Sequence, residues 1–331
     1  MAKYLFTHGH LIIDDRKEFE DGALLVDGDK ILDVYPHTNK VEINEECTVI
    51  DLHGQLLMPG FFDSHTHGLR GVDFNNASNE EIDSISIEYA KKGTTSILNS
   101  LTDIRNFDNL ECEYLRCLGT HLEGPFISEK YKGSHIAKEI DVSLLNDLNN
   151  CKQMTIAPEL ENSELLIEAL NKRNIKVMFG HSDARYKDIK DYKHDGFTHL
   201  FNASSPYHHR DLGLVNLALA EKDRYVEVIA EESHLDLSVI KLIMNEIDKD
   251  KLILVSDSKE DTYLLNGLKN LRKLGASNTD LVAYSSLNAY RLYGMDKRYG
   301  SLIKGRCADF VVLNDDLDVV MTYVKGKIIN V

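Results

Sequence analysis

The middle of the chain repeats one pattern of hydrophobic and polar positions. A short apolar stretch is followed by a polar turn and then by a longer stretch with helical spacing. Near-continuous apolar strands that alternate with helices are typical of parallel strands buried on both faces. Eight such strands are predicted, at 60–67, 94–100, 117–124, 154–159, 176–182, 197–203, 226–234 and 252–258. Eight units of this kind predict an α/β fold, namely a (β/α)8 or TIM barrel.

The helical stretches between these strands support the same fold. Clear examples lie at 79–93, 162–174 and 235–250, where apolar residues recur with the period of a helix. A (β/α)8 barrel usually takes about 250 residues, which matches residues 54–301. We therefore expect this range to form the catalytic domain.

Both ends of the chain show a different pattern. They are rich in β-branched and aromatic residues and are broken by Gly and Asp, as short strands are. The stretches with this composition are 4–14, 22–35, 47–60 and 305–331. We therefore expect residues 1–53 and 302–331 to form one small β-sandwich domain, built from both termini.

The composition and charge of the chain argue against nucleic-acid and membrane partners and indicate a reducing compartment. The chain has 331 residues, 43% of them hydrophobic, and a formal net charge of −16. This charge would repel nucleic acid and anionic membranes, and no apolar run approaches a membrane span, so neither partner is expected. The five cysteines are scattered without a Cys-x-x-Cys pair. This usage predicts no disulfide framework and no thiolate zinc site, and it fits a reducing cytoplasm.

Polar side chains stand at the carboxyl ends of almost all the predicted barrel strands, where such barrels carry their chemistry. His65 and His67 are separated by one residue, so they project from the same face of the first strand. The other strands end in groups that can bind a metal or move a proton. These are Asn99, Glu123, Glu159, His181, His199 with Asn202, His234 and Asp257.

Imidazole nitrogen and carboxylate oxygen are the ligands that zinc and related ions prefer in catalytic sites. A single histidine at a strand end is more often a hydrogen-bond partner of a loop than a metal ligand. The coincidence of four histidines, one Glu and one Asp at equivalent positions nevertheless predicts a divalent metal site. Its candidate residues are His65, His67, Glu123, His181, His199 and Asp257.

Several longer motifs carry a family resemblance. They are MPGFFDSHTHG, HLEGPFISEKYKGSH, IAPE, FGHSDA, THLFNA, SHLDL, LVSDS and GSLIKGRCADFVVLN, and they follow one another from about residue 51 to the C-terminus. The chain resembles the amidohydrolase superfamily and, within it, the N-acetylglucosamine-6-phosphate deacetylase family. The His-x-His strand and the closing motif are shared by the wider superfamily, whereas the motifs around Glu123, His181 and His199 resemble the deacetylase branch.

The resemblance implies a metal centre. Glu123, His181 and His199 would be the main ligands, and His65 and His67 would complete a second position. One or two divalent ions per subunit are expected, with Zn²⁺ as the first candidate and Fe²⁺ as the alternative.

The resemblance also implies catalytic and substrate-binding residues. Asp257 would be the general acid/base that takes a proton from the attacking water and returns it to the leaving amine. Family members contact the sugar phosphate at the positions of His135, Asn202, Ala203, Arg210 and His234. The family tends to form homodimers, so a homodimer is expected here.

The expected reaction on this small-molecule substrate is deacetylation of N-acetylglucosamine 6-phosphate to glucosamine 6-phosphate and acetate. Two departures from the family pattern leave a second reading open, a diverged amidohydrolase acting on another N-acyl or cyclic amide. The segment after Asp257 is shortened, and Glu231 and Glu232 stand where the family usually has Asp-Gly. A non-catalytic relative that kept the barrel is disfavoured, because without catalysis the buried ligand groups would only lower stability.

Overall fold

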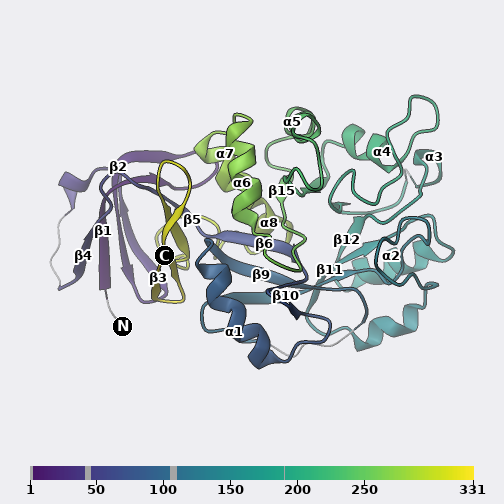
Figure 1. The fold of residues 1–331 in the computed structure, drawn as a ribbon, viewed down its shortest axis with the longest axis horizontal. Helices are drawn as coiled ribbons and strands as arrows, with labels where there is room; N and C mark the ends of the chain where they lie inside the picture. Colours follow the sequence, from purple (N-terminus) through teal and green to yellow (C-terminus); the bar gives the residue numbers. More distant parts are fainter. Residues whose placement is uncertain (1–2, 42–45, 105–109, 190) are drawn as a thin grey trace.

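The computed structural model describes residues 3–41, 46–104, 110–189 and 191–331. Within these ranges the strands form two eight-stranded sheets and a two-stranded ribbon of β7 (Gly68–Leu69) and β8 (Val72–Asp73). Figure 1 shows the sheet that contains both chain ends beside the larger α/β part.

The α/β part is a barrel of parallel strands. Its strands pair in the order in which they occur along the chain. They are β6 (Phe61–Thr66), β9 (Thr94–Leu101), β10 (Arg116–Glu123), β11 (Cys151–Ile156), β12 (Lys176–Phe179), β13 (Gly196–Phe197), β14 (Tyr225–Val228) and β15 (Leu252–Leu254). Each of the eight strands predicted from the sequence is present, so the expected TIM-barrel fold is confirmed.

The first and last barrel strands meet at their carboxyl ends. The backbone nitrogen of His67 donates to the carbonyl oxygen of Ser258 at 2.7 Å. Beside it, the Ser256 hydroxyl donates to the buried Asp63 carboxylate at 2.5 Å. These contacts join β6 to the segment after β15, so the chemistry-bearing ends of the two strands lie side by side.

Helices cover the outside of the barrel because their apolar faces pack against the apolar strands, in one cluster of buried side chains. The larger helices are α1 (Asn79–Ala90), α2 (Ser163–Lys172), α5 (Leu237–Glu246) and α6 (Leu264–Lys273). Shorter ones are α3 (Tyr186–Ile189), α4 (Leu214–Ala220), α7 (Asn278–Val282) and α8 (Asn288–Leu292), with the π-turn η3 (Ala283–Leu287) between the last two. No helix among the described residues has the length and apolar character needed to cross a bilayer.

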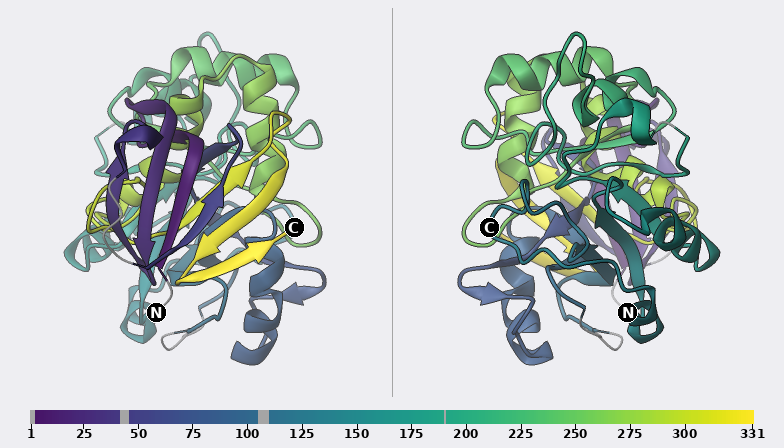
Figure 2. Two further views of the ribbon diagram at one scale, coloured as in Figure 1. Left: turned by 90° about the vertical axis from the view of Figure 1, so that its left-hand side faces the viewer. Right: turned by 90° about the vertical axis from the view of Figure 1, so that its right-hand side faces the viewer.

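The second sheet is built from both ends of the chain. Its strands are β1 (Lys3–Ile12), β2 (Glu18–Asp27), β3 (Lys30–Tyr35), β4 (Thr48–Asp51), β5 (Leu56–Pro59), β16 (Phe310–Leu313), β17 (Val319–Val324) and β18 (Lys327–Asn330). Figure 2 shows the purple N-terminal strands beside the yellow C-terminal strands. Phe310 packs between Phe6, at 5.0 Å, and Tyr323, at 4.9 Å between ring centroids. The expected small β-domain from both termini is therefore present, with its own buried cluster; its strands are hydrogen-bonded into one sheet, whereas the predicted sandwich implied two.

Two groups of charged residues join the terminal sheet to the α/β part. Arg116 of β10 bonds to Asp309 at 2.6 Å and also to Asp29. Arg291 of α8 holds Asp15, which follows β1, through two bonds of 2.8 and 3.1 Å. These contacts attach the terminal sheet to the barrel.

Candidate active site

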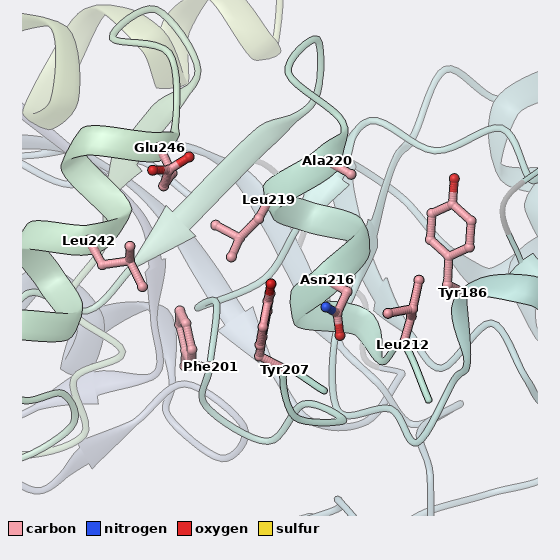
Figure 3. Close-up of a pocket in the computed structure, with 9 residues that line it drawn as sticks. All are labelled: Tyr186, Phe201, Tyr207, Leu212, Asn216, Leu219, Ala220, Leu242 and Glu246. Carbon is pink, nitrogen blue, oxygen red and sulfur yellow. The ribbon is translucent and has the colours of Figure 1, made fainter. Parts of the chain in front are cut away.

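Two hollows in the described α/β part bear on the location of the site. The larger, of about 800 Å³, lies among α3, α4, α5 and the loop after β13 (Figure 3). Its lining is mostly apolar and consists of Tyr186, Phe201, Tyr207, Leu212, Asn216, Leu219, Ala220, Leu242 and Glu246. This hollow contains no residue predicted to bind metal or substrate, so size does not identify the active site here.

The smaller hollow, of about 410 Å³, opens at the carboxyl ends of the barrel strands. It is lined by Gly133, Ser134, His135, His181, His199, Asn202, Ala203, His234, Asp257, Lys259, Glu260 and Thr262. Most of the predicted site residues meet there, so we take it as the candidate active site.

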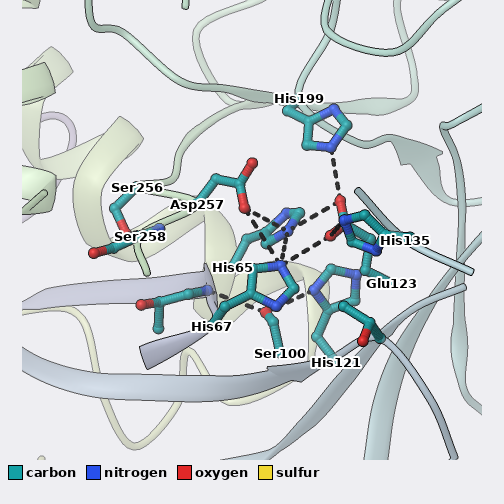
Figure 4. Close-up of polar contacts among 12 residues, drawn as sticks. His65, His67, Ser100, His121, Glu123, His135, His199, Ser256, Asp257 and Ser258 are labelled. Carbon is teal, nitrogen blue, oxygen red and sulfur yellow. Dashed lines mark hydrogen bonds and ion pairs between the residues drawn. The ribbon is translucent and has the colours of Figure 1, made fainter. Parts of the chain in front are cut away.

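Glu123 is the centre of the polar cluster at the floor of this hollow (Figure 4). It ends β10, and its side chain is 1% exposed. Its Oε1 lies 2.9 Å from His181 Nε2 and 2.8 Å from His199 Nε2, and its Oε2 lies 2.8 Å from His67 Nε2. His65 Nε2 approaches the same carboxylate at 3.3 Å. Four imidazoles from three strands thus converge on one carboxylate.

Two groups of potential ligand atoms share Glu123. One group contains His65, His67, Glu123 and Asp257, and the other contains Glu123, His181 and His199, with the ligand atoms of each group within 4.8 Å of one another. This arrangement suits two neighbouring cation positions with a common carboxylate.

Asp257 lies beside the histidine pair of β6. Its Oδ1 is 3.5 Å from His65 Nε2 and 3.3 Å from His67 Nε2, and 21% of its side chain is exposed. Asp257 has a φ of 49°, and His181 and His199 have φ values of 48° and 26°. Side-chain-bearing residues rarely adopt this left-handed region, and such backbone strain clusters at functional sites.

The electrostatics of the cluster favour ionised carboxylates. Burial raises the pKa of Glu123, but the imidazoles of His65 and His181 outweigh burial and hold this pKa well below its usual range. Burial also raises the pKa of Asp257, and again His65 outweighs it, so that this pKa is lowered to about 2. Both carboxylates therefore carry negative charge near neutral pH.

His135 forms part of the wall of the hollow. Its Nε2 lies 3.3 Å from Glu123 Oε2, and its side chain is 8% exposed. Burial lowers the pKa of His135 to about 4. Its imidazole is therefore neutral at physiological pH and can donate a single ring proton.

The predicted substrate-binding residues separate into two groups. Asn202, Ala203 and His234 line the hollow together with His135. Arg210 does not line it: its side chain is exposed, and its backbone nitrogen donates to His208 Nδ1 at 3.2 Å. The described single chain therefore leaves Arg210 away from this hollow.

Three glutamates that the sequence suggested near the site, Glu159, Glu231 and Glu232, do not line the hollow. Glu159 accepts bonds from the Ser182 hydroxyl, at 2.7 Å, and from the backbone nitrogen of Asp183, at 2.6 Å, so it holds the loop after His181. Glu231 and Glu232 do not line the hollow. The geometry therefore gives no support to a repulsion between this pair and a substrate anion.

Sequence reasoning missed His121 beneath the metal-ligand cluster. Its ring packs against His65 at 4.4 Å and contacts Ser100, at 2.9 Å, and Thr155, at 2.8 Å, through its two nitrogens. Burial, reinforced by His65, holds the pKa of His121 well below its usual value. The period of two along a strand could have found it, because His121 and Glu123 share a face of β10.

The chain is similar to known proteins over most of its length. The model of the amidohydrolase family matches residues 56–329. The N-acetylglucosamine-6-phosphate deacetylase of Bacillus subtilis (strain 168) is 29% identical over an alignment 388 positions long, which covers 99% of this chain and 98% of that protein. The N-acetylgalactosamine-6-phosphate deacetylase of Escherichia coli O157:H7 is 25% identical over 340 residues, covering 85% and 89%.

A solved structure shows the same fold. The crystal structure of N-acetylglucosamine-6-phosphate deacetylase from Thermotoga maritima matches with a TM-score of 0.83 and 27% identity, covering 99% of this chain and all of that one. Together with the cluster of histidines and carboxylates, the family match indicates a divalent metal site. The chain belongs to the amidohydrolase family.

Proposed function

We propose that the protein is a metal-dependent amide hydrolase that removes the acetyl group from N-acetylglucosamine 6-phosphate, releasing acetate and glucosamine 6-phosphate. The observation that carries the proposal is the sharing of Glu123 between two ligand groups, with Asp257 at the edge of one of them. The relatives named as deacetylases of amino-sugar phosphates support the choice of substrate.

The residues at the floor of the hollow fit a divalent cation. His65 Nε2 faces His67 Nε2 at 3.3 Å, and His181 Nε2 faces His199 Nε2 at 3.2 Å. Two imidazole nitrogens whose lone pairs face each other repel. A proton or a cation that lies between these lone pairs and the Glu123 carboxylate removes the repulsion. Nitrogen and oxygen donors of this kind suit zinc and iron. We propose Zn²⁺, with Fe²⁺ as the alternative, in one or both positions.

A divalent cation held by these residues would supply Lewis acidity, which would activate water as a nucleophile and polarise a carbonyl oxygen. Asp257 performs the proton transfers: its ionised carboxylate accepts a proton as water attacks the acetyl carbonyl, and it then donates that proton to the amine nitrogen. The second step is essential, because an amide nitrogen leaves only after protonation. The partial exposure of Asp257 toward the hollow lets it reach both groups.

Residues of the wall orient the substrate. His135 Nδ1 and Asn202 Nδ2 are buried and have no hydrogen-bond partner in the described part of the chain. Both residues line the hollow, so they can donate to oxygens of the bound substrate. A neutral His135 suits hydrogen bonding to the acetyl carbonyl, and Asn202 suits the sugar or its phosphate.

A phosphate dianion also requires positive charge. Lys259 is the single Lys or Arg among the described residues that line the hollow. It is exposed, and it takes part in no ion pair within the part of the chain that the structure describes. We assign Lys259, with His234, to the phosphate end of the substrate.

Further features of the proposal follow from the family and from composition. We propose a homodimer that works in the cytoplasm, in line with the scattered cysteines and the acidic surface. We also propose that residues 54–301, apart from β5 of the terminal sheet, act as the catalytic domain and that 1–53 with 302–331 act as a supporting domain.

The test is a hydrolysis screen with protein of measured metal content. We expect acetate release from N-acetylglucosamine 6-phosphate, and weaker turnover of N-acetylglucosamine without the phosphate. Absence of acetate release from the phosphorylated sugar by metal-loaded protein would reject the proposed activity.

A second candidate substrate is favoured by one observation. The relative from Escherichia coli is named for N-acetylgalactosamine 6-phosphate, which differs from the first substrate only at C4 of the sugar. The same screen includes this epimer, and a higher kcat/KM on it than on the gluco sugar would reassign the substrate. Turnover restricted to other N-acyl or cyclic amides would support the diverged amidohydrolase reading.

A further inference from the structure

We propose that Glu227 is a positioning residue for the metal ligand His65, and that a buried hydrogen-bond chain fixes which nitrogen of His65 faces the cation. This inference rests on the metal centre of the proposed function. It assigns a role to a carboxylate that the reaction described above does not use.

The chain of hydrogen bonds runs from His65 across the interior of the barrel. His65 Nδ1 lies 3.3 Å from Glu227 Oε2, and Glu227 Oε1 accepts from Gln153 Nε2 at 2.8 Å. The hydroxyl of Tyr293 donates to Gln153 Oε1 at 2.7 Å. The side chains of His65, Gln153 and Glu227 are fully buried.

The hydrogen bonds that connect Tyr293 to His65 allow one consistent order of donors and acceptors. The Tyr293 hydroxyl donates to the amide oxygen of Gln153, so the amide nitrogen must face Glu227. The Glu227 carboxylate only accepts, so the hydrogen bond from His65 must come from a proton on Nδ1. When His65 binds a cation its imidazole is neutral, and the proton on Nδ1 then leaves the Nε2 lone pair facing Glu123 and Asp257, at 3.3 and 3.5 Å.

Packing alone does not explain why a carboxylate, that of Glu227, is buried inside the barrel. Glu227 stands in the apolar strand β14 between Val226 and Val228, which are both buried. A buried carboxylate costs several kcal/mol unless it is paired, and no Lys or Arg of the described chain forms an ion pair with it. Its contacts are the neutral amide of Gln153 and the ring of His65.

The other ligands lack such a partner. His67 Nδ1 and His199 Nδ1 have no hydrogen-bond partner among the described residues, and His181 Nδ1 contacts the backbone oxygen of Tyr131 at 2.8 Å. A carboxylate behind a metal-ligating histidine fixes the ring orientation and makes the ligand more basic. Glu227 therefore acts on the cation position that contains His65.

Glu227→Gln is the central variant. It keeps the shape of the side chain but places a second amide against the amide of Gln153. If the introduced amide accepts from His65, its nitrogen faces Gln153 Nε2, a contact between two donors. If it turns around, it donates to His65 Nδ1 and forces the proton onto Nε2, toward the cation. In a third arrangement Gln153 turns as well, accepts from the new amide and donates to the Tyr293 hydroxyl. All three arrangements remove the negative charge behind His65, which makes His65 a weaker ligand.

The double variant Gln153→Glu/Glu227→Gln exchanges the carboxylate and the amide, and it thereby restores the order of hydrogen-bond donors and acceptors. The carboxylate introduced at position 153 accepts from the Tyr293 hydroxyl and from the amide at position 227, whose oxygen again accepts from His65 Nδ1. Tyr290→Phe is the matched control. It deletes another buried hydrogen bond inside the barrel, from Tyr290 to Ser96 at 2.7 Å, and leaves the hydrogen bonds between Tyr293 and His65 in place.

The readouts do not depend on activity. Metal-free parent and variants are titrated with Co²⁺, and stoichiometry, affinity and the visible spectrum of the bound ion are recorded. Long-range ¹H–¹⁵N NMR of the Zn²⁺-loaded proteins reports which nitrogen of His65 carries the proton. We expect Glu227→Gln to weaken the ion at His65 about 10- to 100-fold and to leave the ion at His181 and His199 unchanged.

The double variant should recover most of the lost affinity and a proton on Nδ1, and the control should match the parent. Parent-like affinity, spectrum and NMR signals in Glu227→Gln overturn the positioning role and leave the proposed reaction standing. A double variant that folds but stays as weak as Glu227→Gln overturns the hydrogen-bond order. A parent that binds an ion only at Glu123, His181 and His199 overturns this inference but leaves the proposed reaction standing, whereas a parent that binds no ion at either position overturns both.

Discussion

The backbone nitrogen of Asp257 donates a hydrogen bond of 2.8 Å to the carbonyl oxygen of His65. These residues are 192 positions apart in the sequence, since 257 minus 65 is 192. The bond joins the carboxyl end of the first barrel strand to the chain just after the last one. The proposed general acid/base is thereby attached to the backbone of a proposed metal ligand, so the two functions share one rigid support.

Replacement of Asp257 by Asn should abolish proton transfer while leaving the other ligand group intact. Asn cannot accept and return the proton, so kcat should fall about 10²- to 10⁴-fold. Metal analysis should still find an ion with Glu123, His181 and His199. The matched control is Asp261→Asn, on the same loop, where the side chain is 75% exposed and should leave kcat unchanged. Equal kcat in parent and Asp257→Asn would remove Asp257 from the mechanism.

Removal of the metal should inactivate the protein and lower its thermal stability. The ligands are preorganised around Glu123 in the folded state, so a cation binds the folded chain and stabilises it. At a free-ion concentration of 100 times Kd, the expected contribution is about 2.7 kcal/mol. The measurement is a melting curve and an acetate assay before chelation, after chelation and after Zn²⁺ or Fe²⁺ is returned. Full activity in metal-free protein would contradict the proposal.

Lys259 and Glu260 should have opposite effects on a phosphorylated substrate, because both line the hollow and carry opposite charges. Lys259→Gln should raise KM for N-acetylglucosamine 6-phosphate about 3- to 10-fold, the range of a partly solvated charged hydrogen bond. Glu260→Gln should lower KM. Both effects should shrink at high ionic strength and vanish for the sugar without phosphate.

A surface lysine supplies the control for this pair. Lys297 follows α8, is exposed and does not line the hollow. Lys297→Gln removes the same charge and should leave KM unchanged. If Lys259→Gln and Lys297→Gln behave alike, the phosphate is recognised by other groups.

The ion pair of Asp15 and Arg291 should make stability depend on pH. Burial raises the pKa of Asp15, but the bonds and the charge of Arg291 outweigh burial, so this pKa lies below its usual value. A lowered pKa in the folded state stabilises the protein above the unfolded-state pKa of about 3.9. This stabilisation is lost as pH falls through the folded-state pKa.

Asp15→Asn should therefore lower the free energy of unfolding by about 1–3 kcal/mol at pH 7, because a buried bond to a charged group is lost. The Asp15 side chain is 5% exposed, so solvent screens the pair only weakly. Urea unfolding of parent and variant, measured at several pH values, checks the prediction. The difference between the two should narrow below about pH 4; a constant difference down to about pH 3 would show that the charge of Asp15 is not its cause.

The sequence predicted the barrel because its information is local. Apolar runs such as those of β9 and β11, separated by helical periods, indicate parallel strands without any knowledge of their neighbours. Strand period and strand order then placed His65, His67 and Asp257 at one rim, because all carboxyl ends of a parallel barrel point the same way. This is why candidate ligands far apart in the sequence could be named together.

Reasoning from strand period and strand order failed for residues whose position depends on the path of a loop or on the direction of a side chain. Glu159 ends a strand as Glu123 does, yet it bonds to the loop after His181 instead of joining the ligand cluster. Arg210, which the family resemblance implied as a substrate contact, does not line the hollow of the described single chain, and its role in substrate binding stays a prediction. Loop backbones have no period, so their course cannot be read from spacing.

The sequence by itself determined the fold class, the rim of the barrel and the residue types available there, because hydrophobic period and strand polarity are properties of the chain. Only the tertiary structure decided that Glu123 is shared by two groups and that Glu227 stands behind His65. Those relationships depend on distances across the barrel interior, between strands that are remote in sequence. They arise only when the sheet closes and sets the side chains of opposite strands against one another.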